Sequence, residues 1–531
     1  MSTASRPAIV IPATPTSNGD LHVGHLAGPY LAADIYARYL RATGRPVVNT
    51  TCTDDSQSYV ITTAHRLGLP MQVLVDKSAN EIEHTYEAMG GILGDVNRGL
   101  PPVDHTYRET VRRFVTELHA AGKFELRTLS MPFATRARTF LYDGLVSGVC
   151  PSCYANSAGG VCEGCGHPNN FDELLDPRST LDPDDPVEMR ATTILVLPLE
   201  RYRERLAAYY AEHAAVWRPH PKQLIEELLA GPLPDFPVTV PGTWGVAAPF
   251  AETPGQIIYP WIEAMPAAIY STWWSLGAAG DVDAPWLAET DAELIYFHGY
   301  DNVCHWGVLD LVLLMAHDGK YVLPSANVVN EFYELEGEKF STSRGHLVWG
   351  ADLLAEAPRD LVRCYLALTG PEFQRTNFNR DTMARVMTAR LVEPWNELAR
   401  TAADAVAGLP EGTALPTTER GRGRTQAVIE RIKLCFRPEH LSLGRAAETI
   451  LSQVDRLRAA SARLDGDAAL GDLLLELRAL LACASPFLVD ITNGVSTDLD
   501  AELPNEIVPF DFPALPTFSD HAAAAREEAQ P

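Results

Sequence analysis

The sequence has no long apolar run, few cysteines and fewer basic than acidic residues. No stretch reaches the roughly 18 to 20 apolar residues that cross a bilayer, and residues 1–7 carry no apolar run after a basic residue, so we expect neither a membrane span nor a signal peptide. The formal net charge of −26 disfavours general adhesion to nucleic acid but is compatible with a local basic groove. We therefore expect a cytoplasmic protein without membrane partners.

The chain is long enough for several folded units. Its 531 residues exceed what one hydrophobic core serves, and 46% of them are hydrophobic, as in globular proteins. Residues 8 to about 117 alternate β-branched and helix-forming runs, which predicts a parallel sheet with ligands at the strand ends. Residues 123–249 are rich in turns and indicate an insertion. Residues 381–490 have apolar residues at helical spacing, which predicts helices.

Four of the nine cysteines form one cluster with the spacing C-x2-C-x8-C-x2-C. Its members are Cys150, Cys153, Cys162 and Cys165. Two such hairpins can place four thiolates around a zinc ion. The alternatives are a pair of local disulfides, or reduced thiols left from a degenerate site. No nearby histidine or carboxylate spacing suggests an open coordination position, so we predict structural Zn²⁺.

The first apolar run is followed by a turn and two histidines. Residues 9–12 have the composition of a buried strand, and His22 and His25 open a long run of helix formers from 26 to 41. A strand, a turn and a helix start aim backbone N–H groups at an anion, and Gly24 leaves room for a flat group. Taken alone, the histidine pair is better explained as a polar cap.

A second motif far downstream reverses that preference. Residues 338–345, EKFSTSRG, follow a strand-like segment from 327 to 335. HVGH and KFSTS resemble, in the right order, the HIGH and KMSKS signatures of class I aminoacyl-tRNA synthetases. A resemblance to the methionyl enzymes covers about residues 7 to 495, and includes the cysteine cluster, PWIEA at 260–264 and GYD at 299–301.

The resemblance implies an α/β fold. A class I synthetase Rossmann-type parallel sheet would be split by a zinc-bearing insertion and followed by an α-helical bundle of the anticodon-binding type. The expected units are residues 1–117, the first half of the catalytic domain with HVGH; 118–249, the connective insertion with the zinc knuckle; 250–378, the second half with the KFSTS loop; 379–500, the bundle; and 501–531, a proline-rich, disordered tail.

The resemblance also implies a reaction. The family joins an amino-acid carboxylate to the α-phosphate of ATP and releases pyrophosphate, with Mg²⁺ neutralising the leaving group. The catalytic residues would be His22, His25 and Lys339. The remaining ATP contacts would be Gly24, Gly299, Asp301, Ser341 and Ser343. Thr342 replaces the second lysine of KMSKS, which removes one positive charge from the transition state.

The amino-acid pocket departs from the family pattern. The residues implied to line it are Thr14, Thr16, Asp55, Trp261, Ala264, Asn302 and Trp306. Asp55 matches the position that pairs with the substrate ammonium, although without the resemblance a solvated acid explains it better. The family has leucine, tyrosine, isoleucine and histidine at or near the positions of Thr14, Thr16, Asn302 and Trp306. A thioether makes only weak hydrogen bonds, so we predict a shorter or more polar amino acid than methionine.

The acceptor is less well defined by the sequence. Asn396 and Arg400 occupy the positions of an N…R pair on the family's first anticodon-domain helix, which makes tRNA a candidate partner. Residues 457–466 contain no aromatic side chain where the family uses one to read the anticodon, and such stacking contributes about 1–3 kcal/mol per base. A small amine or a carrier protein are therefore alternative acceptors. The sequence does not indicate the oligomeric state.

Three functions fit these observations. The first is a methionyl-tRNA synthetase-like ligase that forms an aminoacyl-adenylate from an amino acid other than methionine. The second is an ordinary or duplicate methionine–tRNA ligase whose pocket residues are assigned wrongly, and the third is a non-catalytic binding paralogue. The altered pocket and the missing aromatic oppose the second, and the intact motif residues oppose the third.

Overall fold

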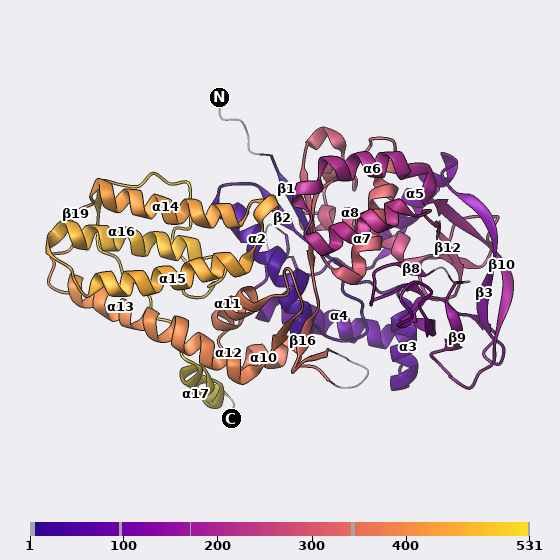
Figure 1. Ribbon diagram of the computed structural model, residues 1–531, viewed down its shortest axis with the longest axis horizontal. Helices are drawn as coiled ribbons and strands as arrows, with labels where there is room; N and C mark the ends of the chain where they lie inside the picture. The colour runs from indigo at the N-terminus through magenta and orange to yellow at the C-terminus, as the bar shows by residue number, and fades with distance from the viewer. Residues whose placement is uncertain (1–5, 95–97, 170, 172, 341–345, 529–531) are drawn as a thin grey trace.

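The computed structural model describes residues 6–94, 98–169, 171, 173–340 and 346–528, and these form two lobes (Figure 1). One lobe contains the larger sheets, and the other is a bundle of helices with one two-stranded sheet. Among the described residues, no helix combines the length and the apolar character needed to span a bilayer.

A four-stranded parallel sheet forms the centre of the first lobe. Its strands, in spatial order, are β15 (Pro324–Asn330), β14 (Glu293–Gly299), β1 (Ala8–Pro12) and β2 (Val47–Asn49). Every neighbouring pair is parallel, so the carboxyl ends of all four strands meet at one edge. The predicted parallel sheet is confirmed, and β1 and β14 pair although a long insertion separates them in the sequence.

Both faces of this sheet are buried under helices. Val10 of β1 packs into one hydrophobic cluster, while Ile9 and Ile11 pack into a second cluster on the opposite face, as alternation along a strand requires. The helices of this lobe are α2 (Leu31–Ala42), α3 (Ser58–Leu67), α4 (Met71–Ala88), α5 (His105–Ala120), α8 (Pro260–Ser275), α9 (Asp310–Ala316), α10 (Gly350–Glu356) and α11 (Arg359–Thr369).

The insertion is built on an antiparallel sheet beside the central one. Its strands, in spatial order, are β11 (Asp235–Pro237), β10 (Val187–Pro198), β3 (Glu125–Ala134) and β4 (Thr139–Phe140). Its helices are α6 (Arg203–Glu212) and α7 (Pro219–Ala230). Short strands β5 (Val146–Val149), β6 (Asn156–Ala158), β7 (Gly160–Val161), β8 (Pro168–Asn169) and β9 (Leu175–Ser179) surround the cysteines.

The second lobe is helical, as its sequence period predicts. It contains α12 (Arg380–Met387), α13 (Glu393–Val406), α14 (Glu419–Cys435), α15 (Leu443–Ser461) and α16 (Gly466–Ala484). Arg363 of α11 joins the lobes, because its fully buried guanidinium contacts the Asp34 carboxylate at 2.7 Å and donates to the carbonyl of Pro486 at 2.7 Å. A buried pair with both partners satisfied fixes the relative position of the elements it joins.

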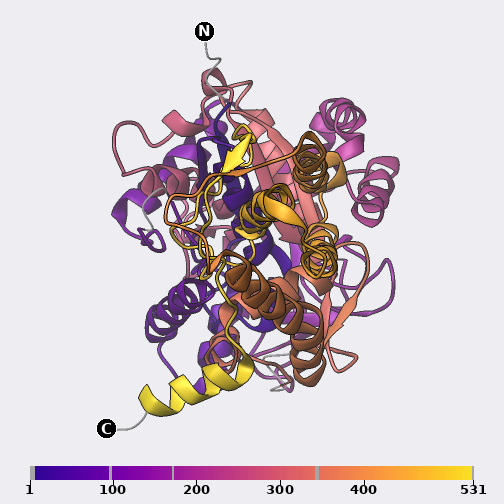
Figure 2. The ribbon, with the colours of Figure 1, turned by 90° about the vertical axis from the view of Figure 1, so that its left-hand side faces the viewer.

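The prediction of a disordered tail is wrong for the described residues after 500. Strand β20 (Glu506–Ile507) pairs with β19 (Leu415–Pro416), and Phe512 and Leu515 are buried. Helix α17 (Phe518–Glu528) follows at the outer edge near the C-terminus (Figures 1 and 2), in contact with α10. The segment lacks a periodic pattern because its prolines prevent regular structure, yet its scattered apolar residues pack against the bundle.

Candidate active site

A cavity of about 410 Å³ opens where the strands of the central sheet end. Its lining residues follow β1, β2, β14 and β15 directly in the sequence, and α8 and the insertion complete the wall. Parallel sheets bind their ligands at this edge. The lining residues include two groups. The histidine wall consists of His22, Gly24, His25 and Phe340. The tryptophan wall consists of Thr14, Thr16, Trp261, Asn302, His305 and Trp306.

The two motif histidines cap each other's backbone. The His25 backbone N–H donates to His22 Nδ1 at 3.2 Å, and the His22 backbone N–H donates to His25 Nδ1 at 3.3 Å, at the start of α1 (Val23–His25). An imidazole nitrogen that accepts a hydrogen bond carries no proton, so each neutral ring holds its proton on Nε2. The polar-cap interpretation and the phosphate-donor interpretation are therefore compatible, because the cap fixes the donor tautomer.

Aromatic stacking holds these rings in place. The ring centroids of His22 and His25 lie 3.6 Å apart with 12° between their planes, and Phe340 stacks at 4.9 Å from His22. A Cβ atom on Gly24 would meet the His22 ring at 3.1 Å and the Phe340 ring at 3.2 Å. An alanine at this position would therefore have to displace these rings by a few tenths of an ångström.

The second motif reaches the same cavity through Phe340. Strand β16 (Tyr333–Leu335) pairs with β17 (Glu338–Lys339), which places the Lys339 backbone opposite Glu334. Ser341 and Ser343, together with Thr342, lie outside the described residues. The structure therefore brings the segment of the second motif beside the first, although the two are more than half the chain apart in the sequence.

Two adjacent acids follow β2, and the one that borders the cavity is Asp54, not the predicted Asp55. Asp54 lines the cavity, whereas Asp55 accepts a hydrogen bond from the Ser17 hydroxyl, and its backbone carbonyl accepts one from Trp244 Nε1 at 2.7 Å. Burial, reinforced by the carboxyl group of Glu263, raises the pKa of Asp54 well above its usual range.

The predicted side-chain pocket is largely assembled in the structure. Thr14, Thr16, Trp261, Asn302 and Trp306 all border the cavity, as do Gly299 and Asp301 from the predicted ATP contacts. Ala264, by contrast, is buried in α8 and does not border it. Trp306 is 1% exposed and meets the Tyr296 ring edge-on, with ring centroids 4.9 Å apart. Its indole is therefore packed within the wall of the cavity.

His305 is the most unusual member of the tryptophan wall and was not predicted from the sequence. Its ring stacks on Trp261 with centroids 3.4 Å apart and 2° between the planes. Both ring nitrogens are buried and neither has a hydrogen-bond partner in the described part of the chain. Burial, with a smaller contribution from His298, lowers the pKa of His305 to about 3. The structural feature that marks His305 is the π-helical segment Val303–Leu309, because such segments are frequent at functional sites.

The insertion contributes Asp143, a second residue that was not predicted from the sequence. It lines the cavity, is 1% exposed, and adopts the left-handed backbone region with φ of 43°. The Tyr259 hydroxyl donates a hydrogen bond to its carboxylate. Burial raises the pKa of Asp143 to about 7. Strained backbone at a buried acid is a feature of functional sites, and no sequence motif marks this residue.

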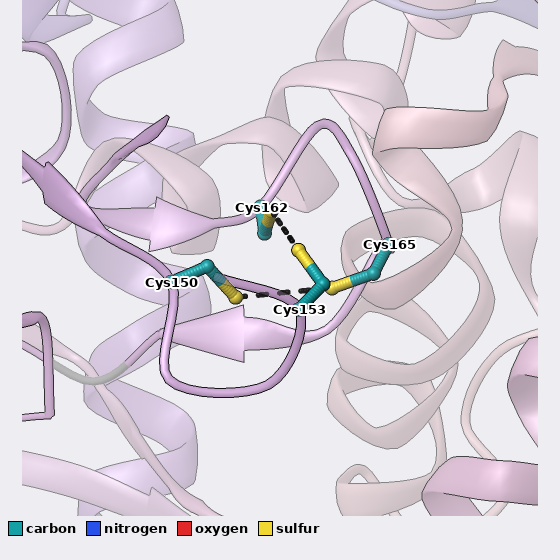
Figure 3. A group of neighbouring side chains, drawn as sticks. All are labelled: Cys150, Cys153, Cys162 and Cys165. Carbon is teal, nitrogen blue, oxygen red and sulfur yellow. Dashed lines mark hydrogen bonds between the residues drawn. The ribbon is translucent and has the colours of Figure 1, made fainter. Parts of the chain in front are cut away.

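The four clustered cysteines converge as predicted (Figure 3). The Sγ atoms of Cys150 and Cys165 are 3.8 Å apart, those of Cys153 and Cys162 are 3.6 Å apart, and all four lie within 4.8 Å of one another. A tetrahedron with Zn–S bonds of about 2.3 Å needs sulfur atoms about 3.8 Å apart. The donor set fits a metal ion and fills all four positions of such a site. All four thiols are free, so the structure contains no disulfide in this cluster.

The two residues assigned to tRNA lie in different environments. The Asn396 amide donates to the carbonyl of Leu515 at 2.9 Å and accepts from the Leu515 N–H at 2.8 Å. Arg400 is exposed. Asn396 thus holds the C-terminal segment, a role that the expectation of a disordered tail concealed.

Comparisons with known proteins agree with this architecture. A family model described as tRNA synthetases class I (M) matches residues 8–402. The methionine–tRNA ligase of Flavobacterium psychrophilum is 32% identical over 379 residues, which make up 70% of this chain and 54% of that protein. The methionine–tRNA ligase of Chlorobium limicola is 33% identical over 382 residues, with the same two shares. The chain spans about half the length of these curated relatives.

A solved structure shows the same fold. Mycobacterium tuberculosis methionyl-tRNA synthetase in complex with methionyl-adenylate superposes with a TM-score of 0.69 and 19% sequence identity, over 92% of this chain and 93% of that chain. The family match over most of the chain, the relatives above 30% identity and the two motifs at one cavity lead to the same conclusion. The chain belongs to the class I tRNA synthetases and resembles their methionyl members.

Proposed function

We propose that the protein is an ATP-dependent ligase that activates an amino acid as an aminoacyl-adenylate and then transfers it to tRNA or another acceptor. The observation that carries this proposal is the pair of mutually capped histidines at the carboxyl edge of the sheet. Class I synthetase membership supports the same chemistry.

The reaction requires positioning and charge stabilisation more than proton transfer. A carboxylate oxygen of the amino acid attacks the α-phosphorus of ATP, and the bond to the pyrophosphate oxygen breaks. His22 and His25 donate through Nε2 to phosphate oxygens as negative charge shifts to the leaving group. Lys339, Ser341 and Ser343 of the second motif are the further phosphate contacts in this proposal. Mg²⁺ bound with ATP would supply positive charge to the pyrophosphate leaving group.

The remaining contacts follow from the walls of the cavity. Gly24, Gly299 and Asp301 border the space for the nucleotide. Asp54 replaces Asp55 as the partner of the substrate ammonium. The raised pKa of Asp54 belongs to the free protein, and an ammonium group placed beside the carboxyl would favour its charged form.

The amino acid is not methionine in this proposal. The relatives are named methionine–tRNA ligases, but two threonine hydroxyls, an asparagine amide and an imidazole border the cavity here. Methionine would leave these groups unpaired, and a site with buried donors and acceptors strongly rejects such a ligand. The alternative, methionine activation, is favoured only by the names of the relatives.

The metal of the cysteine cluster is structural zinc in this proposal. The four sulfur atoms leave no coordination position for substrate, and the cluster lies within the insertion that completes the cavity wall. We expect about one zinc per chain by elemental analysis of the purified protein. A chelator should unfold the insertion, because binding and folding of such sites are coupled. A metal-free protein with disulfides across the cluster would contradict the assignment.

The acceptor is tRNA, a small amine or a carrier protein. Arg400 remains exposed for a tRNA contact, whereas a contact with Asn396 requires the segment around Leu515 to leave. The basic residues Arg420, Arg422 and Arg424 begin α14 and form a second candidate surface, although Arg424 already pairs with Glu476 at 2.9 Å.

The decisive experiment is ATP–pyrophosphate exchange with a panel of amino acids, with and without tRNA. We expect exchange with at least one amino acid other than methionine. Exchange that occurs only with methionine would establish the alternative substrate. Failure of every amino acid, with a folded protein that still binds ATP, would favour a non-catalytic synthetase-like protein.

A further inference from the structure

The imidazole of His305 is a buried polar group without a partner. It is 2% exposed, and neither Nδ1 nor Nε2 has a hydrogen-bond partner among the described residues. Leaving such a group unpaired in a buried position is unfavourable. Because His305 borders the cavity, a ligand bound there can supply the missing partner when the wall moves enough to expose one of the buried ring nitrogens.

The stack on Trp261 limits where that partner can lie. With the two rings parallel and 3.4 Å apart, the plane of the imidazole is fixed, and its second aromatic neighbour, Phe236, meets it edge-on at 5.9 Å. Hydrogen bonds to an imidazole lie in the plane of its ring. Both nitrogens therefore recognise groups that lie in the imidazole plane, which runs parallel to the indole of Trp261 on the face that His305 covers.

The charge around the cavity restricts the ligand further. Among the described lining residues, carboxyl groups come from Asp20, Asp54, Asp143, Glu163, Asp301 and Glu331, and none is lysine or arginine. Burial keeps His305 neutral by lowering its pKa to about 3, so it offers no positive charge at neutral pH. An anionic side chain would lie among carboxyl groups without a cation.

A neutral imidazole has one donor and one acceptor. An apolar side chain satisfies neither nitrogen, and an ammonium group satisfies only the acceptor. A side-chain amide or hydroxyl both donates and accepts. The neighbouring polar groups of Thr14, Thr16 and Asn302 suit the same chemistry.

We propose that His305 is the specificity-determining residue of this cavity and that it selects an amino acid with a neutral amide or hydroxyl side chain. This inference rests on the proposed function for the site, and adds to it the chemical class of the substrate. His305 contacts the side chain of the substrate and takes no part in the bond changes at phosphorus.

The test compares wild type with His305→Phe. Phenylalanine preserves the flat ring against Trp261 and removes both nitrogens. The ligands are asparagine, glutamine, serine, threonine and homoserine, with methionine, leucine, aspartate, glutamate, lysine and ornithine as comparisons. Calorimetry measures the binding of each free amino acid, and pyrophosphate exchange measures kcat/KM.

We expect one of the amide or hydroxyl amino acids to give the highest kcat/KM with wild type. His305→Phe should lower its kcat/KM relative to leucine or methionine by about ten-fold or more. The same variant should unfold at the same or a higher Tm without ligand, because it removes an unpaired buried polar group. A purely structural role for His305 would instead give a lower Tm and an unchanged ratio.

The matched control is His317→Phe. His317 is also a buried imidazole between aromatic rings, 4.4 Å from Phe114 and 5.1 Å from Tyr321 between ring centroids, but it does not border the cavity. This variant should keep the wild-type ratio of kcat/KM values.

Several outcomes would overturn the inference: a wild-type preference for an apolar, acidic or cationic amino acid, a ratio unchanged by His305→Phe, or no binding of any amide or hydroxyl amino acid. Binding of such an amino acid that depends on His305, without any pyrophosphate exchange, would support the inference and contradict the proposed ligase function. Exchange with methionine as the best substrate would instead support the proposed ligase function and contradict the inference.

Discussion

The histidine wall and the tryptophan wall of the same cavity follow different rules. In the histidine wall, each imidazole is held by a backbone hydrogen bond and a stacked ring. In the tryptophan wall, His305 is held only by stacking, and its nitrogens have no partner in the described structure. The first arrangement is satisfied within the protein, and the second offers two nitrogens with which a ligand can pair.

The difference separates catalysis from selection. Donors that act in the transition state work best when they are already oriented, because no reorganisation is then required. Groups that select a substrate work through the cost of remaining unpaired with the wrong ligand. The four predictions that follow test this contrast, beginning with the wall in which we expect the larger effect.

Removing a donor from the histidine wall should have the largest effect. We expect His25→Ala to lower exchange turnover by roughly 10²-fold, because a donor to the phosphate is lost in the transition state. Lys339→Ala should have an effect of the same order. Circular dichroism and Tm serve as folding controls. An unchanged exchange rate in either variant would show that the phosphate site is assigned wrongly.

Displacing the same wall without removing a donor should have a smaller effect. In Gly24→Ala the new Cβ would lie 3.1 Å from the His22 ring and 3.2 Å from Phe340, so these rings must move by a few tenths of an ångström. We expect exchange to fall about ten-fold, because catalysis is sensitive to position. Gly423→Ala, in α14 with no atom within 4 Å of the new Cβ, is the control and should exchange at the wild-type rate.

Restoring the family residues in the tryptophan wall should change selectivity more than rate. The variant Thr14→Leu, Thr16→Tyr, Asn302→Ile and Trp306→His should raise kcat/KM for methionine relative to the preferred amino acid by about five-fold or more. Because Trp306 is buried, the triple variant without Trp306→His controls for loss of stability. Efficient use of methionine by wild type would instead show that these residues do not set the preference.

The smallest expected effect is a change in how the stability of the protein depends on pH, and it concerns Glu263 of α8. Glu263 is buried and accepts hydrogen bonds from Tyr107 at 2.8 Å and Ser56 at 3.0 Å, and burial raises its pKa to about 7. Between about pH 4.5 and 7 the unfolded chain releases this proton while the folded protein keeps it, so the contribution of Glu263 to stability falls as pH rises.

We therefore expect Glu263→Gln to lose less stability than wild type between pH 5 and 7, by a few degrees in Tm. Subtracting the wild-type profile isolates this group from Asp143, whose raised pKa acts in the same direction, and from His305, whose lowered pKa acts in the opposite one. Glu411→Gln, on an exposed loop, should follow the wild-type profile. Parallel profiles for wild type and Glu263→Gln would refute this assignment.

Much of the fold was predictable because its signals are local. The β-branched run of β1, the helical period of the bundle and the paired CxxC hairpins each describe interactions within a few residues. His22, Gly24 and His25 were found for the same reason, since their spacing sets their geometry at the start of α1. Both motifs were identified from the sequence, and the structure brings their segments together.

The errors concern contacts between distant segments. Asp55 matches the family position, whereas the cavity is bordered by Asp54, whose backbone forms a bridge with Thr16. Ala264 matched a motif but lies in the interior of α8. The tail was expected to be disordered because its composition is unfavourable, although Trp395 Nε1 donates to the Pro513 carbonyl at 2.8 Å and Phe512 stacks on the same indole.

The sequence by itself determined the family, the parallel sheet, the cysteine cluster and the histidine pair, because spacing along the chain fixes the relative position of nearby groups. Only the tertiary structure decided which acid faces the cavity, that Asp143 closes it from the insertion, and that His305 lies unpaired on Trp261. Whether a buried polar group is satisfied depends on every segment packed around it, and no local pattern contains that information.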